Sequence, residues 1–218
     1  MGERGWHLLR LPEAKTAGGV DEDVLLAALR PFGLPSSRDG ERAVWPISPR
    51  GSPTDTFSVR SGRADLHTDS QYRADPERWV SFYCVRPAPD GGASLVLSAA
   101  DALAALRRHP EGQRAEALLR EPAFHWRVPA IFHAGEPHGG RPVIDEALIR
   151  WRWDNLVDLG PSHAWAAALF HETLLGCDAV VEIGLAPGDL LIVDNQRALH
   201  GRTHFESADR LLMRVRLW

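Results

Sequence analysis

The stretch Asp189-Leu-Leu-Ile-Val-Asp-Asn-Gln-Arg-Ala-Leu-His-Gly-Arg-Thr-His-Phe205 decides the fold, because an apolar strand pattern runs directly into a polar turn. The turn Pro187-Gly188-Asp189 precedes the strand predicted over Asp189–Asp194. Further strands are predicted on either side of it, over 179–183 and 210–217. Many short strands separated by turns are typical of an antiparallel jelly roll, so the chain is expected to be mainly β.

Upstream of this stretch the sequence predicts more strands and a few flanking helices. Strands are expected over 6–11, 42–47, 80–86 and 94–97, and helices over 22–30, 99–108, 111–120 and 162–175. Asp21, Ser98 and Ser162 are the expected N-caps of three of these helices, and Gly176 is the expected end of the last one. Residues 50–64 are polar and are expected to form a loop that approaches His67. No repeat or long linker divides the sequence, so residues 1–218 are expected to form one domain.

Composition narrows the classes of protein that fit. The formal net charge of −4 argues against a general nucleic-acid binder, which would carry a basic surface. No apolar run is long enough to span a membrane, and the first residues lack the apolar core of a signal peptide. Cys84 and Cys177 are too few for a disulfide framework and are expected to be reduced core residues. A cytoplasmic location is therefore expected.

His67-Thr-Asp69 is the pair of residues with the clearest chemistry. On an extended strand, residues two apart point to the same face, so this imidazole and this carboxylate can occupy two neighbouring positions around one metal ion. An imidazole from His200 would complete a two-histidine, one-carboxylate triad. Such a triad leaves positions of an octahedral Fe(II) open for other ligands.

The pattern His-x-Asp/Glu is weak by itself, since chance alone gives about one in a chain of this composition. It occurs three times, at His67, His109 and His204. The pair that begins at His109 contains a proline and marks the end of a predicted helix, whereas His204 lies too near His200 to share an ion with it easily. Only His67-Thr-Asp69 leads into a long apolar strand.

Two parts of the sequence resemble the taurine dioxygenase and clavaminate synthase-like family of Fe(II)/2-oxoglutarate oxygenases. The stretch Asp189–Phe205, with its pattern Asp-Asn, x-Arg, x-x-His-Gly-Arg, x-x-Phe, resembles the distal-histidine region of that family. Leu66-His-Thr-Asp-Ser70, followed by Pro87-Ala-Pro-Asp-Gly-Gly-Ala-Ser94, resembles its proximal half. The resemblance covers about residues 60–215 and implies a double-stranded β-helix, which is the jelly roll of this family.

The resemblance implies a role for individual residues. His67, Asp69 and His200 match the iron ligands of the family. Arg210 matches the arginine that pairs with the distal carboxylate of 2-oxoglutarate. Ser94 lies where the family often has a threonine that assists the same carboxylate, and a serine hydroxyl can still donate.

Arg214 matches a second arginine that often pairs with an acidic group of the substrate in amino-acid and sulfonate oxidising relatives. Because Arg210 and Arg214 share one face of a strand, both can point into a barrel while the alternate residues pack behind. A solvated sheet face is the competing interpretation for these arginines, and Arg216 is expected at the surface. Tyr72 is a candidate for the wall of the substrate cavity.

The function expected from the resemblance is oxidation, most simply hydroxylation, of a small polar substrate such as an amino acid or a related small acid. Fe(II) would be the metal, and 2-oxoglutarate and O2 the cosubstrates. Desaturation or ring closure is an alternative outcome of the same chemistry. A cupin-like metal-binding protein without redox activity is an alternative of another class, although such a protein has no need for Arg210. A small molecule is the expected partner, with no nucleic acid and no membrane, and the sequence leaves the oligomeric state open.

Overall fold

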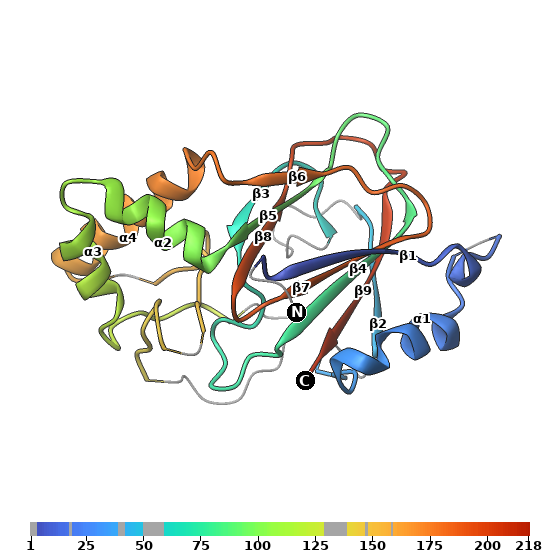
Figure 1. Ribbon diagram of the computed structural model, residues 1–218, viewed down its shortest axis with the longest axis horizontal. Coiled ribbons are helices and arrows are strands. Elements are labelled where there is room, and N and C mark those ends of the chain that lie inside the picture. Colours follow the sequence, from blue (N-terminus) through green and yellow to red (C-terminus); the bar gives the residue numbers. More distant parts are fainter. Residues whose placement is uncertain are drawn as a thin grey trace.

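Two antiparallel sheets form the centre of the molecule (Figure 1). The computed structural model describes residues 4–17, 19–38, 42–49, 59–128, 139–146, 148–157 and 159–218. The larger sheet has the strand order β1 (Trp6–Arg10), β7 (Asp189–Asp194), β4 (Trp79–Arg86), β9 (Leu211–Leu217) and β2 (Val44–Ile47). The smaller sheet has the order β3 (Ala64–His67), β8 (Ala198–Arg202), β5 (Ser94–Ser98) and β6 (Val181–Ile183). The prediction of a mainly β protein is confirmed.

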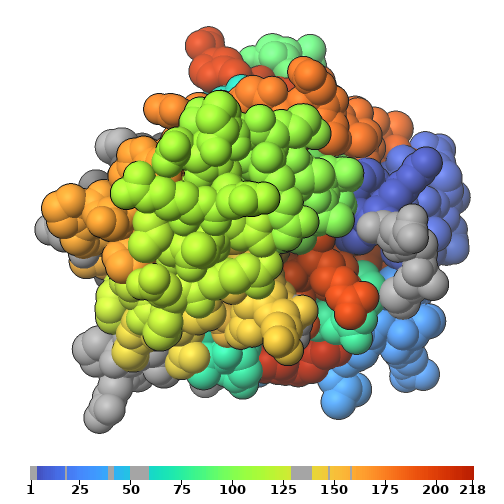
Figure 2. Space-filling view, turned by 60° about the vertical axis from the view of Figure 1, so that its left-hand side comes forward, coloured from blue at the N-terminus to red at the C-terminus, as the bar shows by residue number. Residues whose placement is uncertain are grey.

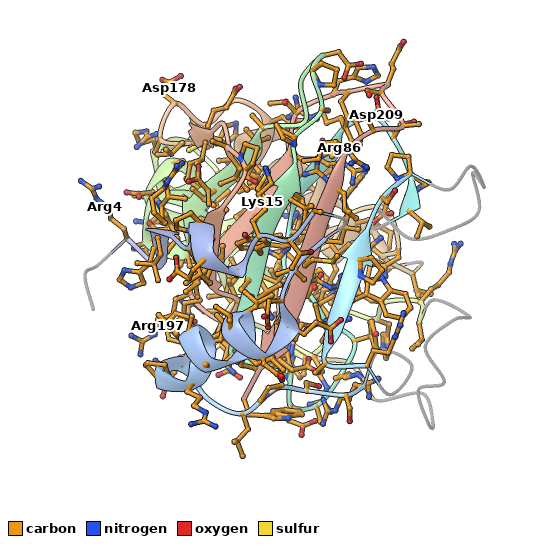
Figure 3. The ribbon with its side chains drawn as sticks, turned by 90° about the vertical axis from the view of Figure 1, so that its right-hand side faces the viewer. Arg4, Lys15, Arg86, Asp178, Arg197 and Asp209 are labelled. Atoms are coloured by element: carbon orange, nitrogen blue, oxygen red, sulfur yellow. The ribbon has the colours of Figure 1, made fainter. Side chains whose placement is uncertain are left out.

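The helices lie at two separate places on the sheets. α1 (Glu22–Leu29), flanked by the 3-10 turns Pro12–Ala14 and Arg30–Phe32, lies on the outer face of the larger sheet, as Figure 3 shows from that side. α2 (Ala99–Arg108), α3 (Gly112–Leu119) and α4 (Pro161–Leu175) gather beyond the smaller sheet (Figure 1). In the space-filling view of Figure 2, the segment of α2 and α3 forms the front of this end of the molecule.

Most of the predicted helix caps are confirmed. Asp21 accepts a hydrogen bond from the backbone N–H of Val24, and Ser98 accepts one from that of Asp101. The prediction for α4 is wrong by two residues, since Gly160 is the N-cap. Proline is favoured in the first turn of a helix because it has no N–H to leave unsatisfied, so the helix begins at Pro161 and its N-cap is Gly160 instead of Ser162.

Alternation along the strands divides the apolar residues among three clusters. Between the two sheets lie Val80, Cys84, Val96, Leu191 and Leu212, among others. The opposite face of the larger sheet packs under α1, and the opposite face of the smaller sheet packs against α2, α3 and α4. Each sheet therefore has an outer face covered by helices and an inner face that looks onto the other sheet.

β8 needs a glycine where it runs beside β3. A Cβ atom at Gly201 would lie 2.6 Å from the backbone oxygen of Ala64, which is closer than a side chain tolerates. The two strands therefore approach each other closely next to His200.

Cys84 and Cys177 are buried and free, as predicted. None of the helices described is long and apolar enough to cross a membrane. Residues 50–58 of the predicted polar loop lie outside the described residues.

Candidate metal centre

The pairing of β3 with β8 brings two histidines together. The strands are antiparallel, and His67 lies directly opposite His200 in their register. The two imidazole rings have centroids 4.4 Å apart. Both side chains are buried, at 7% and 5% of full exposure. Residues that are far apart in the sequence thus present two nitrogen ligands to one point.

Asp69 reaches the same point from a turn and not from a strand. β3 ends at His67, and Ser70 has a φ of 57°, so the expectation of an extended strand through Asp69 is wrong. Asn195 holds the turn instead: its side-chain oxygen accepts from the N–H of Asp69 at 2.7 Å, and its amide donates to the Asp69 carbonyl at 3.0 Å. Side-chain bonds to the backbone thus fix the carboxylate beside the histidines.

The three side chains form a donor set suited to a divalent transition metal. One ligand atom from each of His67, Asp69 and His200 lies within 4.8 Å of the other two. The Nε2 atoms of the histidines are 3.8 and 3.9 Å from Oδ1 of Asp69. Nδ1 of His67 lies 2.7 Å from the Asp65 carbonyl, which only accepts, so this nitrogen carries the proton and Nε2 presents its lone pair. Two imidazoles and one carboxylate fit Fe(II).

Burial and charge set the protonation states that a metal requires. Burial lowers the pKa of His200 to about 3 and lowers the pKa of His67 as well, so both imidazoles are neutral near pH 7. Burial alone would raise the pKa of Asp69, but the guanidinium groups of Arg214 and Arg216 hold it well below its ordinary value. The ligands are therefore deprotonated, as metal binding demands.

A cavity of about 780 Å³, part of it open to solvent, adjoins these ligands. Side chains from both sheets line it, and they include all of the predicted site residues: His67, Asp69, His200, Arg210, Ser94, Arg214 and Tyr72. Phe82 packs its ring 5.3 Å from that of His200 on the wall of the larger sheet. The structure thus brings the predicted residues to one cavity.

Arg210 is a buried cation for which the described part of the chain offers no acidic partner. It is only 4% exposed, its Nη2 makes one long hydrogen bond of 3.4 Å to the Gly92 carbonyl, and its guanidinium lies 5.1 Å from the centre of the Phe205 ring. No carboxylate of the described residues lies within ion-pair distance of it. Burial lowers its pKa to about 10, which still leaves it charged near pH 7. A buried charge of this kind requires an anion, and the hydroxyl of Ser94 lies on the same cavity.

Arg214 and Arg216 both face the cavity, and the prediction that Arg216 lies at the surface is wrong. Residues 212, 214 and 216 of β9 alternate with residues that pack toward α1, so Arg216 points inward with the others. It is 5% exposed, donates to Ser70 Oγ and lies 3.7 Å from a carboxylate oxygen of Glu77. Arg214 Nη1 lies 3.2 Å from Oδ2 of Asp69.

The chain matches the model of a known protein family over most of its length. Residues 18–216 match the model of the taurine catabolism dioxygenase TauD, TfdA family. The chain belongs to the TauD/TfdA dioxygenase family. The predicted family is thereby confirmed.

Individual relatives of this TauD/TfdA protein act on amino acids. An L-lysine 3-hydroxylase of Catenulispora acidiphila is 28% identical over 170 residues, which cover 69% of this chain and 44% of that protein. The chain thus matches less than half the length of this curated relative. A solved structure of asparagine oxygenase with Fe(II), hydroxyasparagine and succinate superposes with a TM-score of 0.81 at 22% identity and covers 99% of this chain and 75% of that one. The iron oxygenase OrfP with Fe and α-ketoglutaric acid superposes with a TM-score of 0.71 at 19% identity and covers 98% of this chain and 74% of that one. These likenesses confirm the double-stranded β-helix.

Proposed function

We propose that this TauD/TfdA protein is an Fe(II)- and 2-oxoglutarate-dependent dioxygenase that hydroxylates a free amino acid or a related small acid. The observation that carries the proposal is the placement of the triad His67, Asp69 and His200 on the same cavity as Arg210, a buried cation that pairs with no carboxylate of the described residues. The names of similar proteins support the choice of substrate class: one is an L-lysine 3-hydroxylase, one is an asparagine oxygenase, and the iron oxygenase OrfP has a solved structure with (3S)-hydroxy-L-Arg bound.

His67, Asp69 and His200 would hold the iron. When bound, the iron supplies the activation of O2 that oxidises an unreactive C–H bond, with 2-oxoglutarate converted to succinate. The triad offers ligands from one side only, which leaves the cavity side of the metal for cosubstrate. Asn195 keeps the Asp69 turn in place through its two hydrogen bonds.

Arg210 and Ser94 would hold the far carboxylate of 2-oxoglutarate. A guanidinium matches a carboxylate with two parallel hydrogen bonds, and a buried one gains more from that pair than an exposed one. Gly92 keeps the necessary space open: its φ is +70°, and a Cβ there would lie 3.1 Å from Nε of Arg210. The hydroxyl of Ser94 can add one donor to the same anion.

Arg214 would bind the acidic group of the substrate, and Tyr72 would form part of the wall around it. Arg214 lies on the wall of the larger sheet, next to Oδ2 of Asp69 and therefore next to the proposed metal position. A carboxylate bound there would hold the neighbouring carbon atoms close to the iron, which is the geometry that positional hydroxylation needs.

The test is turnover by the purified chain supplied with Fe(II), 2-oxoglutarate and a panel of free amino acids and other small acids. Hydroxylation predicts succinate in equal amount to a product heavier by one oxygen atom. A product lighter by two hydrogen atoms would show desaturation or ring closure instead. Failure of the Fe(II)-loaded protein to bind 2-oxoglutarate would favour the non-redox metal-binding alternative.

A further inference from the structure

Gln71 is a buried polar residue of the turn that carries Asp69. It is 1% exposed and lines the cavity together with its neighbours Ser70 and Tyr72. Its Nε2 donates to Oδ1 of Asn155 at 3.1 Å. Its Oε1 is buried and accepts no hydrogen bond from any residue that the structure describes. The amide thus has one end with a partner and one end without.

The neighbouring residues fix which end of the Gln71 amide is the unpaired acceptor. The nitrogen and the oxygen of a side-chain amide have nearly the same shape, so their places follow from their partners. Nδ2 of Asn155 lies 2.9 Å from the Arg127 carbonyl, which only accepts, so this nitrogen donates and Oδ1 faces Gln71. Because that oxygen also only accepts, Gln71 turns Nε2 toward it. Oε1 of Gln71 is left as the acceptor.

An unpaired acceptor of this kind is rare in the molecule. Buried polar atoms nearly always have a hydrogen-bond partner, since the loss of water is otherwise uncompensated. Among the described residues, the buried side-chain oxygens without a hydrogen bond are those of Gln71 and Glu77. Glu77 lies 3.7 Å from the guanidinium of Arg216 and does not line the cavity. Oε1 of Gln71 is therefore the unpaired oxygen that belongs to the candidate site.

The rest of the cavity wall offers a substrate many donors. Five of the described residues that line it are arginines, whose side chains only donate. Among the oxygens of the wall, Oδ2 of Asp69 lies 3.2 Å from Arg214, and Oγ of Ser70 accepts a hydrogen bond from Arg216. A substrate that carries an N–H group therefore finds an acceptor at Gln71.

The position of Gln71 indicates which group of the substrate it meets. Gln71 follows Asp69 by two residues, and the proposed function puts the acidic group of the substrate beside Oδ2 of Asp69. In an α-amino acid the amino group is bonded to the carbon that bears this carboxylate, so it lies at the same turn. An amide oxygen accepts from an amino group without adding negative charge next to a ligand of the metal.

We propose that Oε1 of Gln71 accepts a hydrogen bond from the α-amino group of the substrate. The substrates are then α-amino acids with a free amino group, and acids of the same carbon skeleton that lack this group are discriminated against. This inference rests on the proposed function, since it assumes oxidation of an amino acid or a related small acid at this metal.

The first experiment compares each amino acid that is hydroxylated with the acid that lacks only its α-amino group. Succinamate is this counterpart for L-asparagine, and 6-aminohexanoate is the counterpart for L-lysine. The wild type should favour the amino acid in kcat/KM by at least about tenfold, which corresponds to about 1.4 kcal/mol. Equal or better turnover of the deamino acid overturns the inference and leaves the proposed function intact. If no acid or amino acid is hydroxylated, the proposed function fails and this inference fails with it.

The second experiment removes the acceptor. Gln71→Met keeps the length of the side chain and lacks the amide oxygen, so the ratio of kcat/KM for the amino acid to that for the deamino acid should fall at least about fivefold. Gln113→Met is the matched control, because Gln113 is an exposed glutamine of α3 that does not line the cavity. It should leave the ratio unchanged. An equal loss for both acids in Gln71→Met would show that Gln71 serves only the bond to Asn155, and would overturn the inference.

Binding measured without turnover separates recognition from chemistry. The best amino acid and its deamino counterpart are each titrated calorimetrically into the Fe(II)- and 2-oxoglutarate-loaded protein in the absence of O2. Gln71→Met should bind the amino acid at least about fivefold more weakly than the wild type and the deamino acid equally well, while iron content and 2-oxoglutarate affinity stay the same. Unchanged affinity for the amino acid in a variant that retains iron would overturn the inference. The wild-type comparison of the two acids tests it equally should the variant fail to fold.

Discussion

Arg214 and Asp69 form a buried ion pair in which Nη1 of the arginine lies 3.2 Å from Oδ2 of the carboxylate. The other oxygen, Oδ1, faces Nε2 of both His67 and His200. The two oxygens of one carboxylate thus have separate partners, a cation on one side and the position of a metal on the other. This arrangement puts the cation that we assign to the substrate against a proposed ligand of the metal.

Replacement of Arg214 should affect the substrate far more than the cosubstrate. Arg214→Gln removes the guanidinium fork that would bind the substrate carboxylate, so KM for the prime substrate should rise more than tenfold, which corresponds to roughly 2 kcal/mol. The affinity for 2-oxoglutarate in the absence of substrate should change little, because Arg210 supplies that site. Steady-state kinetics and 2-oxoglutarate titration measure the two effects. An unchanged substrate KM would show that Arg214 serves only Asp69.

Loss of the distal histidine should abolish iron binding. His200→Ala leaves two ligands, which do not form a facial set, so the Fe(II) content after reconstitution should fall to a small fraction of that of the wild type. His204→Ala is the control, since His204 is an exposed histidine four residues further along the chain. Iron analysis of the desalted proteins measures how much Fe(II) each variant retains. Full iron content and turnover in His200→Ala would contradict the ligand assignment.

Removal of Arg210 should weaken the binding of 2-oxoglutarate specifically. Arg210→Ala takes away the buried cation that would meet the distal carboxylate, and loss of one partner of such a pair typically costs about 2–5 kcal/mol. The concentration of 2-oxoglutarate for half-maximal rate should therefore rise by more than tenfold. Arg210→Lys keeps a charge but loses the bidentate geometry, and it should fall between the wild type and Arg210→Ala. Equal 2-oxoglutarate dependence in all three proteins would exclude this role.

The fold followed from local patterns wherever one face of an element is apolar throughout. β7 and β4 are continuous apolar runs, and the capped helices α1 and α2 begin at the residues that their sequences indicate. β8 was not among the predicted strands. It is short and mixes apolar residues with His200, Gly201 and Arg202, so it lacks an alternating or continuous apolar pattern.

The meeting of His67, Asp69 and His200 could be predicted because these residues form part of a long motif, but their surroundings could not. Arg216 is expected at the surface from the sequence because no neighbouring residue indicates its partner Glu77, which lies two residues before β4. Arg152, which lines the same cavity, belongs to no motif, and its place depends on the two hydrogen bonds between Trp151 and Thr68, one to the Thr68 hydroxyl and one between backbone groups. Such long-range contacts exist only once the two sheets are assembled.

The pair of Arg216 and Glu77 should contribute mainly to stability. Glu77 is fully buried, accepts a hydrogen bond from Ser36 at 2.8 Å, and lies 3.7 Å from Nη1 of Arg216. Glu77→Leu leaves a buried guanidinium with one fewer acidic partner and should lower the free energy of unfolding by about 3 kcal/mol. The double variant Glu77→Leu with Arg216→Met should recover part of this loss. Urea unfolding of the three proteins measures the effect, and a single variant as stable as the wild type would contradict it.

Glu116 should give a stabilising contribution that depends on pH. It accepts hydrogen bonds from Arg107 at 2.6 Å and from Arg120 at 2.7 Å, and these contacts lower its pKa from 4.5 to about 2. A carboxyl group whose pKa is lower in the folded protein stabilises the fold fully above its unfolded pKa, and this contribution is lost as the pH falls toward the folded value. Glu116→Gln should therefore be less stable than the wild type by about 1 kcal/mol near pH 7, a modest value because both arginines are largely exposed. The difference should shrink steadily as the pH falls from about 4.5 toward about 2.

Urea unfolding at several pH values measures this difference in stability. Glu121→Gln is the control for charge loss at the same end of the molecule. A difference that is constant across this pH range would show that Glu116 is not held by ionic bonds.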